Sequence, residues 1–459
     1  MIPSNRIHKL HFIGIGGAGM SGIAEVLHQN GFVISGSDMS DSAVVQVLRS
    51  LGIRISIGHV ASNVEGADLV VYSSAVRSDN AEMVEAGRRK IPVIRRAEML
   101  GELMRLKYTL AIAGTHGKTT TTSMVGQIFE VAGKDPTVIV GGVVKGRGTG
   151  AKIGKGEYLV AESDEFDRSF LEMMPTSAII TNIDADHLDC YKDLNEIKDA
   201  FVQFANKVPF YGQVIACMDD EGVQDVLSRL KKPVVTYGFN RQADYRVSNL
   251  HFENGVPFFD VLAKGKSLGS FSLKVPGRHN ILNATASIAL ALEENIELET
   301  VRSALAAFTG VKRRFEYIGE GSGVLVYDDY AHHPTEVRAT LQGIREAYPE
   351  RNVVVVFQPH LYSRTLDHYE SFGTEFMNCD VLLVLDVYGS REKPIEGVTG
   401  AMVSNAADRR GHKNARHIPT KEVALDILTQ ELKKGDLVVL MGAGDIWKMG
   451  MPIVEMLKG

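Results

Sequence analysis

The 459-residue sequence has few cysteines and no long apolar run, and each lack excludes a class of protein. Its three cysteines (Cys190, Cys217 and Cys379) are far apart and odd in number, so they indicate neither a disulfide framework nor a CxxC metal site. The N-terminal segment lacks the apolar core of a signal peptide, and no stretch approaches the ~18 apolar residues that a membrane span needs. We therefore expect a cytoplasmic protein without membrane insertion.

An excess of basic residues is also missing. The formal net charge is −6 at pH 7, whereas nucleic-acid-binding proteins usually carry a basic face, so no nucleic-acid partner is expected. The one conspicuous basic stretch, "RRKIPVIRR" (88–96), has acidic residues around it and is interpreted as solvated surface.

The composition that is present is typical of a folded protein, with 44% hydrophobic and 23% charged residues. The length indicates about three domains. Short β-branched runs alternate with amphipathic stretches, which predicts α/β units with parallel sheets. No fixed-period repeat or low-complexity tract interrupts this order. We place the domains at 1–107, 108–311 and 312–459.

The pattern predicts the position of individual elements. The expected strands are 9–15, 32–38, 67–75, 108–114, 157–163, 177–183, 213–218, 233–238, 323–331, 352–359, 380–387 and 436–442. The expected helices include 19–31, 118–133 and 280–295, and residues 240–275 are expected to form a small antiparallel meander.

A glycine-rich loop follows the first expected strand. In "FIGIGGAGMSG" (12–22), Gly14, Gly16 and Gly19 form G-x-G-x-x-G, and Asp38 ends the next strand. Such a loop opens a helix whose N-terminal amides favour a diphosphate. On pattern alone the ligand would be NAD, with Asp38 on a ribose hydroxyl; a tight turn without a ligand is the alternative.

A second loop, "AGTHGKTTTTS" (113–123), is a shortened nucleotide-triphosphate loop. Its Gly114 is two residues closer to the lysine than in G-x-x-x-x-G-K-[ST]. Gly117 lets backbone amides face phosphate oxygens, Lys118 can reach the β- and γ-phosphates, and Thr119 can bind Mg²⁺. A helix start capped by threonine would explain Thr119 but not the Gly-Lys pair.

Acidic clusters follow the next two strong strands of the same domain. They contain Glu162, Asp164, Glu165 and Asp167, then Asp184, Asp186, His187 and Asp189. Either cluster alone could be an acidic helix N-terminus. Two clusters on either side of the G-K-T loop, at the carboxyl ends of strands, favour a Mg²⁺ site.

Polar motifs also follow strands of the last domain: "VYDDYAHHPTEV" (326–337), "QPHLYSRT" (358–365) and "GAGDIW" (442–447). A zinc site at His332 and His333 is not favoured, because adjacent histidines cannot easily face one ion and no cysteine joins them. His360 and Arg364 are four residues apart, so in a helix they would share a face and hold a small carboxylate. A solvated arginine with a capping histidine is the alternative.

In this order, the motifs "GTHGKTTTT", "ESDEFDRSF", "TNIDADHLD", "GRHNILNATAS", "KRRFE", "DDYAHHPTEV" and "QPHLYSRT" make the sequence resemble the Mur ligases. The likeness covers essentially the whole chain, and with "HFIGIGGAGMSGIA" it is similar to the alanine-adding branch. The family's G-T-x-G-K-T loop matches the short spacing seen here.

The resemblance implies a Rossmann-like N-terminal domain, a central P-loop ATPase-type α/β domain and a C-terminal Rossmann-like domain. It implies that ATP and Mg²⁺, with two ions, support the joining of UDP-N-acetylmuramate to L-alanine through an acyl phosphate. The first loop would hold the UDP-sugar diphosphate in place of NAD. A monomer or homodimer is expected. A recycling ligase for an L-Ala-γ-D-Glu-containing tripeptide is the nearest alternative; an NAD-dependent oxidoreductase and a non-catalytic nucleotide sensor are more distant ones.

The resemblance also implies roles for particular residues. For the UDP-sugar it implies Gly14, Gly16, Gly17, Ala18, Gly19, Met20, Ser21, Asp38 and Ser73. For ATP it implies Gly114, Thr115, His116, Gly117, Lys118, Thr119, Thr120, Asn280, Asn283, Arg314 and Asp329. Thr119, Glu162 and His187 would bind metal, and Lys118 and His187 would be catalytic. Tyr330, His332, His360 and Arg364 would form the alanine pocket.

One feature departs from the wider family. Several Mur ligases carry a carbamylated lysine about fifteen residues beyond the metal-binding histidine. Counting from His187 leads to "FVQFA" (201–205), which has no lysine. The alanine-adding branch is expected to lack it, and what replaces its charge is open.

Overall fold

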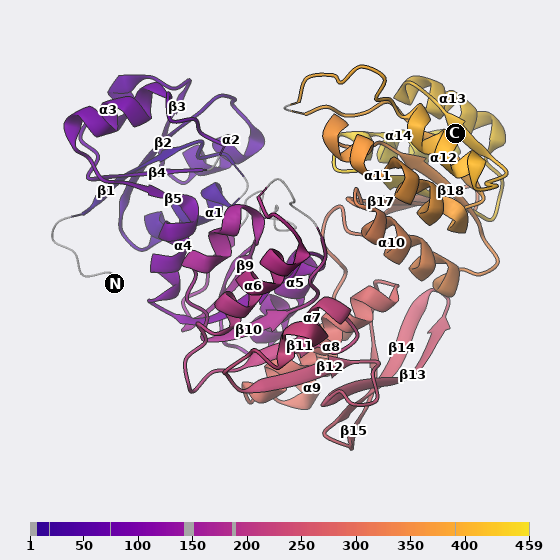
Figure 1. Ribbon diagram of the computed structural model, residues 1–459, viewed down its shortest axis with the longest axis horizontal. Helices are drawn as coiled ribbons and strands as arrows, with labels where there is room; N and C mark the ends of the chain where they lie inside the picture. Colours follow the sequence, from indigo (N-terminus) through magenta and orange to yellow (C-terminus); the bar gives the residue numbers. More distant parts are fainter. Residues whose placement is uncertain are drawn as a thin grey trace. The chain divides into compact units, whose positions relative to one another are not determined.

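The structure, a computed structural model, describes residues 7–17, 19–73, 75–141, 151–185, 190–390 and 392–458. The chain forms two compact units (Figure 1). Unit 1 comprises Met1–Asn249, Phe259–Phe271 and Leu282–Ala307. Unit 2 comprises Leu250–Phe258, Ser272–Ile281 and Phe308–Gly459.

The first sheet of unit 1 is parallel, with strand order β3-β2-β1-β4-β5. Its strands are β1 (Lys9–Ile13), β2 (Val33–Asp38), β3 (Arg54–Ile57), β4 (Leu69–Tyr72) and β5 (Val93–Arg95). Its helices are α1 (Met20–Gln29), α2 (Ala43–Ser50), η1 (Ala61–Val64), α3 (Ala81–Arg89) and α4 (Arg96–Met104). One face of the sheet packs against α1, α2 and α4, and the other packs against α3 and η1. The order reverses at β1, the place where open α/β sheets bind ligands.

The second sheet has ten strands in the order β15-β14-β13-β12-β11-β10-β6-β9-β7-β8. The strands are β6 (Tyr108–Ala113), β7 (Thr137–Ile139), β8 (Ala151–Lys152), β9 (Tyr158–Ser163), β10 (Ser177–Ile180), β11 (Val214–Cys217), β12 (Val234–Gly238), β13 (Tyr245–Glu253), β14 (Val256–Ala263) and β15 (Lys266–Ser272). The helices between and after them are α5 (Lys118–Val131), η2 (Phe166–Glu172), α6 (Leu194–Ala205), α7 (Glu221–Leu227), α8 (Arg278–Glu293) and α9 (Leu298–Ala307). Parallel pairing of β6 with β9 and β10 puts the carboxyl ends of these strands at one edge.

Helix α4 of the first sheet packs directly on η2 of the second. The contact is close because residue 101 is glycine: a Cβ at Gly101 would clash with the carbonyl oxygen of Glu172. Met99, Leu100, Leu103 and Phe170 belong to one continuous buried core. Burial of this apolar surface joins the two sheets of unit 1.

Unit 2 contains a six-stranded sheet in the order β16-β17-β21-β18-β19-β20, parallel except for the edge strand β16. Its strands are β16 (Glu316–Gly321), β17 (Val324–Asp329), β18 (Asn352–Phe357), β19 (Val381–Val384), β20 (Ala415–His417) and β21 (Asp436–Met441). Its helices are α10 (Pro334–Ala347), α11 (Tyr362–Glu375), η3 (Phe376–Asn378), α12 (Ala401–Arg409), α13 (Lys421–Glu431), η4 (Ile446–Met449) and α14 (Gly450–Lys458). Side chains of α10, α11 and α12 fill one face of the sheet, and those of α13 and α14 fill the other.

The fold class predicted from the sequence, α/β with parallel sheets, is confirmed. Each expected strand is present, shortened by up to five residues. The antiparallel edge strand β16 and the short strands β3, β5, β7, β8 and β20 were not expected. No helix among the described residues is long and apolar enough to cross a membrane.

Candidate active site

The second glycine loop connects β6 to α5, and two of its residues need glycine. Gly114 and Gly117 have φ angles of 135° and 84°, which strain residues with a side chain. A Cβ at Gly114 would collide with Thr181, and one at Gly117 would lie 2.7 Å from Oδ1 of Asn283. The loop is therefore enclosed by the segment after β10 and by α8, and Asn283, which is expected to bind ATP, lies next to it.

Residues just after β10 hold the loop by hydrogen bonds. The amide of His116 donates to Oδ1 of Asn182 (2.7 Å), and Thr181 Oγ1 donates to the His116 carbonyl (2.6 Å). The amide of Asp184 donates to Oγ1 of Thr115 (2.9 Å). These bonds hold the loop in place. Thr120, which follows in α5, is buried.

Lys118 lies folded against its own loop. Its ammonium group donates to the carbonyls of Gly114 (2.7 Å) and Thr115 (3.1 Å) and lies 2.8 Å from the Glu165 carboxylate. Burial lowers the pKa of Lys118, but the charges of Glu165 and Asp164 outweigh it and hold the pKa above its usual value. Lys118 thus keeps its positive charge at the N-terminus of α5, where a phosphate would bind.

Thr119 and Glu162, two predicted metal ligands, are in direct contact. Thr119 Oγ1 lies 3.1 and 3.0 Å from the two carboxylate oxygens of Glu162, the last residue but one of β9. A hydroxyl and a carboxylate beside a phosphate loop are the hard oxygen donors that Mg²⁺ requires. The third predicted ligand, His187, lies outside the described residues.

The first loop is hydrogen-bonded to Asp38, the acidic residue predicted beside it. Oδ2 of Asp38 accepts from the amide of Gly16 (2.9 Å), and its Oδ1 accepts from Ser40 (3.2 Å). A Cβ at Gly16 would lie 3.0 Å from that Asp38 oxygen and 2.8 Å from Val45. The loop therefore needs glycine at position 16 to approach Asp38 this closely.

The remaining predicted UDP-sugar residues lie around this loop, except Ala18, which is outside the described residues. The amides of Met20 and Ser21, both buried in α1, donate to the carbonyl of Gly17. Ser73 follows β4, the neighbour of β1, and its hydroxyl accepts from the amide of Ala75 (3.3 Å). The structure brings these residues to the same edge of the first sheet.

Arg96 also lies at this loop, and the sequence did not single it out. A Cβ at Gly19 would lie 2.7 Å from Nη1 of Arg96, so the guanidinium rests against the start of α1. In contrast, Arg95 is exposed and pairs with Glu98 at 2.9 Å. The basic stretch is therefore surface at Arg95, but its last residue, partly buried, faces the glycine loop.

Three of the predicted alanine-pocket residues form a row of rings in unit 2. Tyr330 and His332 have centroids 5.1 Å apart, and His332 and His360 have centroids 6.1 Å apart. Burial lowers the pKa of His332, and the positive charge of Arg364 lowers it further, against the effect of Glu336. The four residues are thus brought together around His332, whose surroundings favour the neutral imidazole.

The expectation that His360 and Arg364 share a helix face is wrong. Helix α11 begins at Tyr362, and His360 precedes it in a bridge with Tyr388. Leu361, between them, has φ 67° and ψ 137°, which turns the chain before the helix starts.

The two other predicted nucleotide residues of the last domain are engaged within it. Arg314 lies over the ring of Tyr330 (5.1 Å) and 3.2 Å from Glu336. Asp329 accepts from Oγ1 of Thr340 (2.7 Å), and burial raises its pKa to about 6. Asn280, also predicted for ATP, is buried and donates to the Pro276 carbonyl at 2.7 Å.

The neighbouring Asp328 makes stability depend on pH. Burial raises its pKa from 3.8 to about 7, although the charge of Arg313 lowers it. Because the folded state holds the proton more tightly, its stabilising effect is complete below pH 4 and is lost as the pH rises toward 7. Asp328→Asn should remove up to about 1.4 kcal/mol per pH unit of this dependence. Melting temperatures of both proteins between pH 4.5 and 7.5 measure it; parallel curves would contradict it.

Comparisons with known proteins agree with this geometry. The family models "Mur ligase family, catalytic domain", "Mur ligase middle domain" and "Mur ligase, glutamate ligase domain" match residues 9–108, 112–291 and 313–444. The chain belongs to the Mur ligase family, whose members are three-domain α/β enzymes.

Particular relatives carry more specific names. A UDP-N-acetylmuramate–L-alanine ligase from Geotalea uraniireducens is 50% identical over 454 residues, 99% of each chain. The crystal structure of a UDP-N-acetylmuramate–alanine ligase from Thermotoga maritima is similar with a TM-score of 0.81 and 32% identity, over 97% of this chain and 98% of that one. A UDP-N-acetylmuramate:L-alanyl-γ-D-glutamyl-meso-diaminopimelate ligase from Neisseria meningitides has a TM-score of 0.62 and 30% identity, over 67% of this chain and 100% of that one.

Proposed function

We propose that this protein is an ATP-dependent ligase that joins L-alanine to UDP-N-acetylmuramate, an early step of peptidoglycan synthesis. The observation that carries the proposal is the 50% identity, over 99% of the chain, with a ligase of that name. The products are ADP, phosphate and UDP-N-acetylmuramoyl-L-alanine.

Carboxylates are poor electrophiles, so the reaction needs activation. The lactyl carboxylate of the sugar attacks the γ-phosphorus of ATP, and ADP leaves. The amine of alanine then attacks the carbonyl carbon of the acyl phosphate, and phosphate leaves. Negative charge develops on the transferred phosphoryl group, and the Lys118 ammonium, with the amides at the start of α5, stabilises it.

Gly114 to Thr120 and Asn283 are proposed to bind ATP, together with Asn280, Arg314 and Asp329 from their own elements. Thr119 and Glu162 would hold one Mg²⁺, and His187 would hold a second. When bound, these ions supply positive charge that offsets the charge of the phosphates. The contact between Thr119 and Glu162 supports this assignment.

Tyr330, His332, His360 and Arg364 are proposed to bind alanine. Arg364 would hold the carboxylate of the amino acid by paired hydrogen bonds. We further propose three domains, at 1–107, 108–311 and 312–459, because each range contains one sheet. We also propose that the protein is cytoplasmic and is a monomer or homodimer.

Phosphate release tests the proposal. The purified protein is given ATP, Mg²⁺ and UDP-N-acetylmuramate with either L-alanine or the L-alanyl-γ-D-glutamyl tripeptide. Turnover with L-alanine is expected. Turnover with the tripeptide alone would keep the chemistry and replace the substrate, and no turnover with either would refute the proposal.

Arg96 gives a sharper test of the first loop. A guanidinium resting on the start of α1 can bind a diphosphate oxygen, an interaction between charged groups that is worth about 10- to 100-fold in affinity. Arg96→Ala should therefore raise the Kd for UDP-N-acetylmuramate by at least about tenfold. The KM for ATP should not change.

Arg95→Ala is the matched control, because this neighbour is exposed and pairs with Glu98. It should leave the Kd for the UDP-sugar within about twofold, as expected for a surface ion pair. Equal effects of the two substitutions in calorimetric titrations would exclude a specific role for Arg96.

A further inference from the structure

Tyr388 stacks on one of the residues proposed to bind alanine. It follows β19, and its ring lies nearly parallel to the His360 imidazole, with centroids 6.0 Å apart and an interplanar angle of 16°. The backbones are joined as well: the Leu361 amide donates to the Tyr388 carbonyl (3.0 Å), and the Tyr388 amide donates to the Pro359 carbonyl (2.8 Å). Residues on both sides of His360 are therefore fixed to Tyr388.

The backbone that these bonds fix is strained. Leu361 has a positive φ of 67°, which costs a non-glycine residue roughly 1–3 kcal/mol. Such a conformation persists only where the surroundings hold it, and it is common at functional sites. Thr365 holds it from the helix side, because its amide and hydroxyl both donate to the Leu361 carbonyl (3.1 and 2.7 Å). Leu361 separates His360 from the helix that carries Arg364, so the turn sets the position of both.

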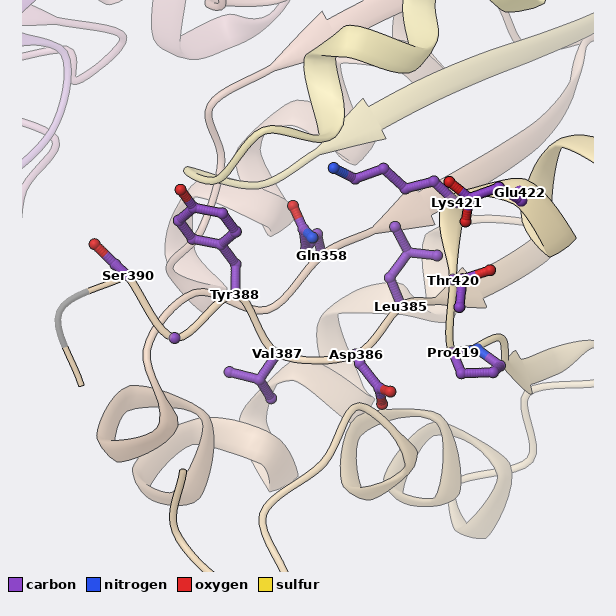
Figure 2. A pocket seen from close by; sticks show the side chains of 11 residues that line it. Gln358, Leu385, Asp386, Val387, Tyr388, Ser390, Pro419, Thr420, Lys421 and Glu422 are labelled. Atoms are coloured by element: carbon purple, nitrogen blue, oxygen red, sulfur yellow. The ribbon is translucent and has the colours of Figure 1, made fainter. Parts of the chain in front are cut away.

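The Tyr388 side chain, which is 37% exposed, also packs beside Gly444. A Cβ at Gly444 would lie 2.8 Å from Cγ of Tyr388 and 2.7 Å from Oε1 of Gln358, so glycine leaves just enough room for both side chains. Tyr388 and Gln358 line a pocket of about 520 Å³ together with Lys421, and Figure 2 shows these side chains around the same cavity. The ring cannot turn toward Gly444 without disturbing this packing.

We propose that Tyr388 is a positioning residue for the amino-acid substrate: it holds His360, and through Leu361 the start of α11, in the arrangement that binds alanine. The inference rests on the proposed function of His360 and Arg364. Its effect should be confined to the amino acid, since Tyr388 is joined to Pro359, His360 and Leu361, beside the residues proposed to bind alanine. A misplacement of about 1 Å in such a site can cost about a hundredfold in rate.

Kinetics of Tyr388→Leu and Tyr388→Phe test the proposal. The leucine variant loses the stacked ring and should raise the KM for L-alanine about tenfold or more. The KM values for ATP and UDP-N-acetylmuramate should stay within about twofold, since only the amino-acid site is displaced. The phenylalanine variant keeps the ring and should restore the KM for L-alanine to near the wild-type value.

Gly444→Ala perturbs the ring from the opposite side and should raise the KM for L-alanine without replacing Tyr388 itself. Glu422→Gln, an exposed change on the pocket wall away from His360, is the control and should leave it unchanged. Melting temperatures identify any variant that fails to fold.

Equal rises in all three KM values, or no recovery in the phenylalanine variant, would overturn the inference. Wild-type turnover with the tripeptide in place of alanine would overturn the proposed function instead. In that event the same ratio of KM values, measured for the tripeptide, decides the role of Tyr388.

Discussion

Replacing Lys118 with alanine should lower phosphate release by at least about a hundredfold to a thousandfold, the usual cost of one preorganised charge or donor at a transferring group. The ammonium group contacts the loop carbonyls of Gly114 and Thr115 and brings a positive charge to them. Binding of UDP-N-acetylmuramate at the first loop should be nearly normal, because that loop has its own donors. Phosphate release and calorimetric titration with the UDP-sugar measure the two effects. Full activity in Lys118→Ala would refute the assignment.

The same substitution removes the ammonium group that lies 2.8 Å from the Glu165 carboxylate, which is 2% exposed. Removing one partner of a buried ion pair costs about 3–5 kcal/mol of stability. Lys118→Ala should therefore also melt at a lower temperature. The double variant Lys118→Ala/Glu165→Gln removes the buried charge and should recover most of the melting temperature while staying inactive. Recovery of activity in the double variant would show that the single variant had failed for lack of stability.

Glu162→Gln should have the second-largest effect. In the proposed site the carboxylate beside Thr119 would give Mg²⁺ a charged ligand, and an amide would give it a neutral one. The Mg²⁺ concentration for half-maximal rate should rise about 10- to 100-fold, the range seen when metal-site groups are changed. Magnesium titrations at saturating ATP and UDP-sugar measure the shift.

The control is a glutamate just before the same strand. Glu157 precedes β9 and is exposed, whereas Glu162 is at its carboxyl end. Glu157→Gln removes the same charge from the protein as a whole but should leave the magnesium titration unchanged. A similar shift in both variants would point to general electrostatics and away from a metal site.

Local signals explain why so much of the fold was predictable. Strands such as β6 and β18 are continuous β-branched or apolar runs, and α1 and α5 each follow an N-cap glycine that the loop geometry requires. The alternation of these signals predicts parallel sheets, and parallel sheets bring residues that follow different strands to one edge. Thr119 and Glu162, 43 residues apart, meet for this reason.

Other features depend on contacts that no local pattern reports. Glu165 is one of four acids in its motif, and the sequence could not indicate which of them would bind Lys118. Tyr388 reaches His360 only through the order of strands in the third sheet. Whether a helix would include both His360 and Arg364 could not be predicted, because a leucine, not a glycine, takes the positive φ, so the usual signal for a turn is missing.

The packing of α4 on η2 gives the two phosphate loops a common support. Helix α4 begins at Arg96, against the first loop, and at Gly101 it rests on η2, whose preceding residue is Glu165, the partner of Lys118 in the second loop. Thermodynamic linkage is reciprocal. If a ligand in one loop changes the affinity of the other loop by some factor, a ligand in the second loop changes the affinity of the first by the same factor. A bulkier residue at position 101 would therefore change the cooperativity between the binding of the sugar nucleotide and the binding of ATP, although the residues of both loops would be unchanged.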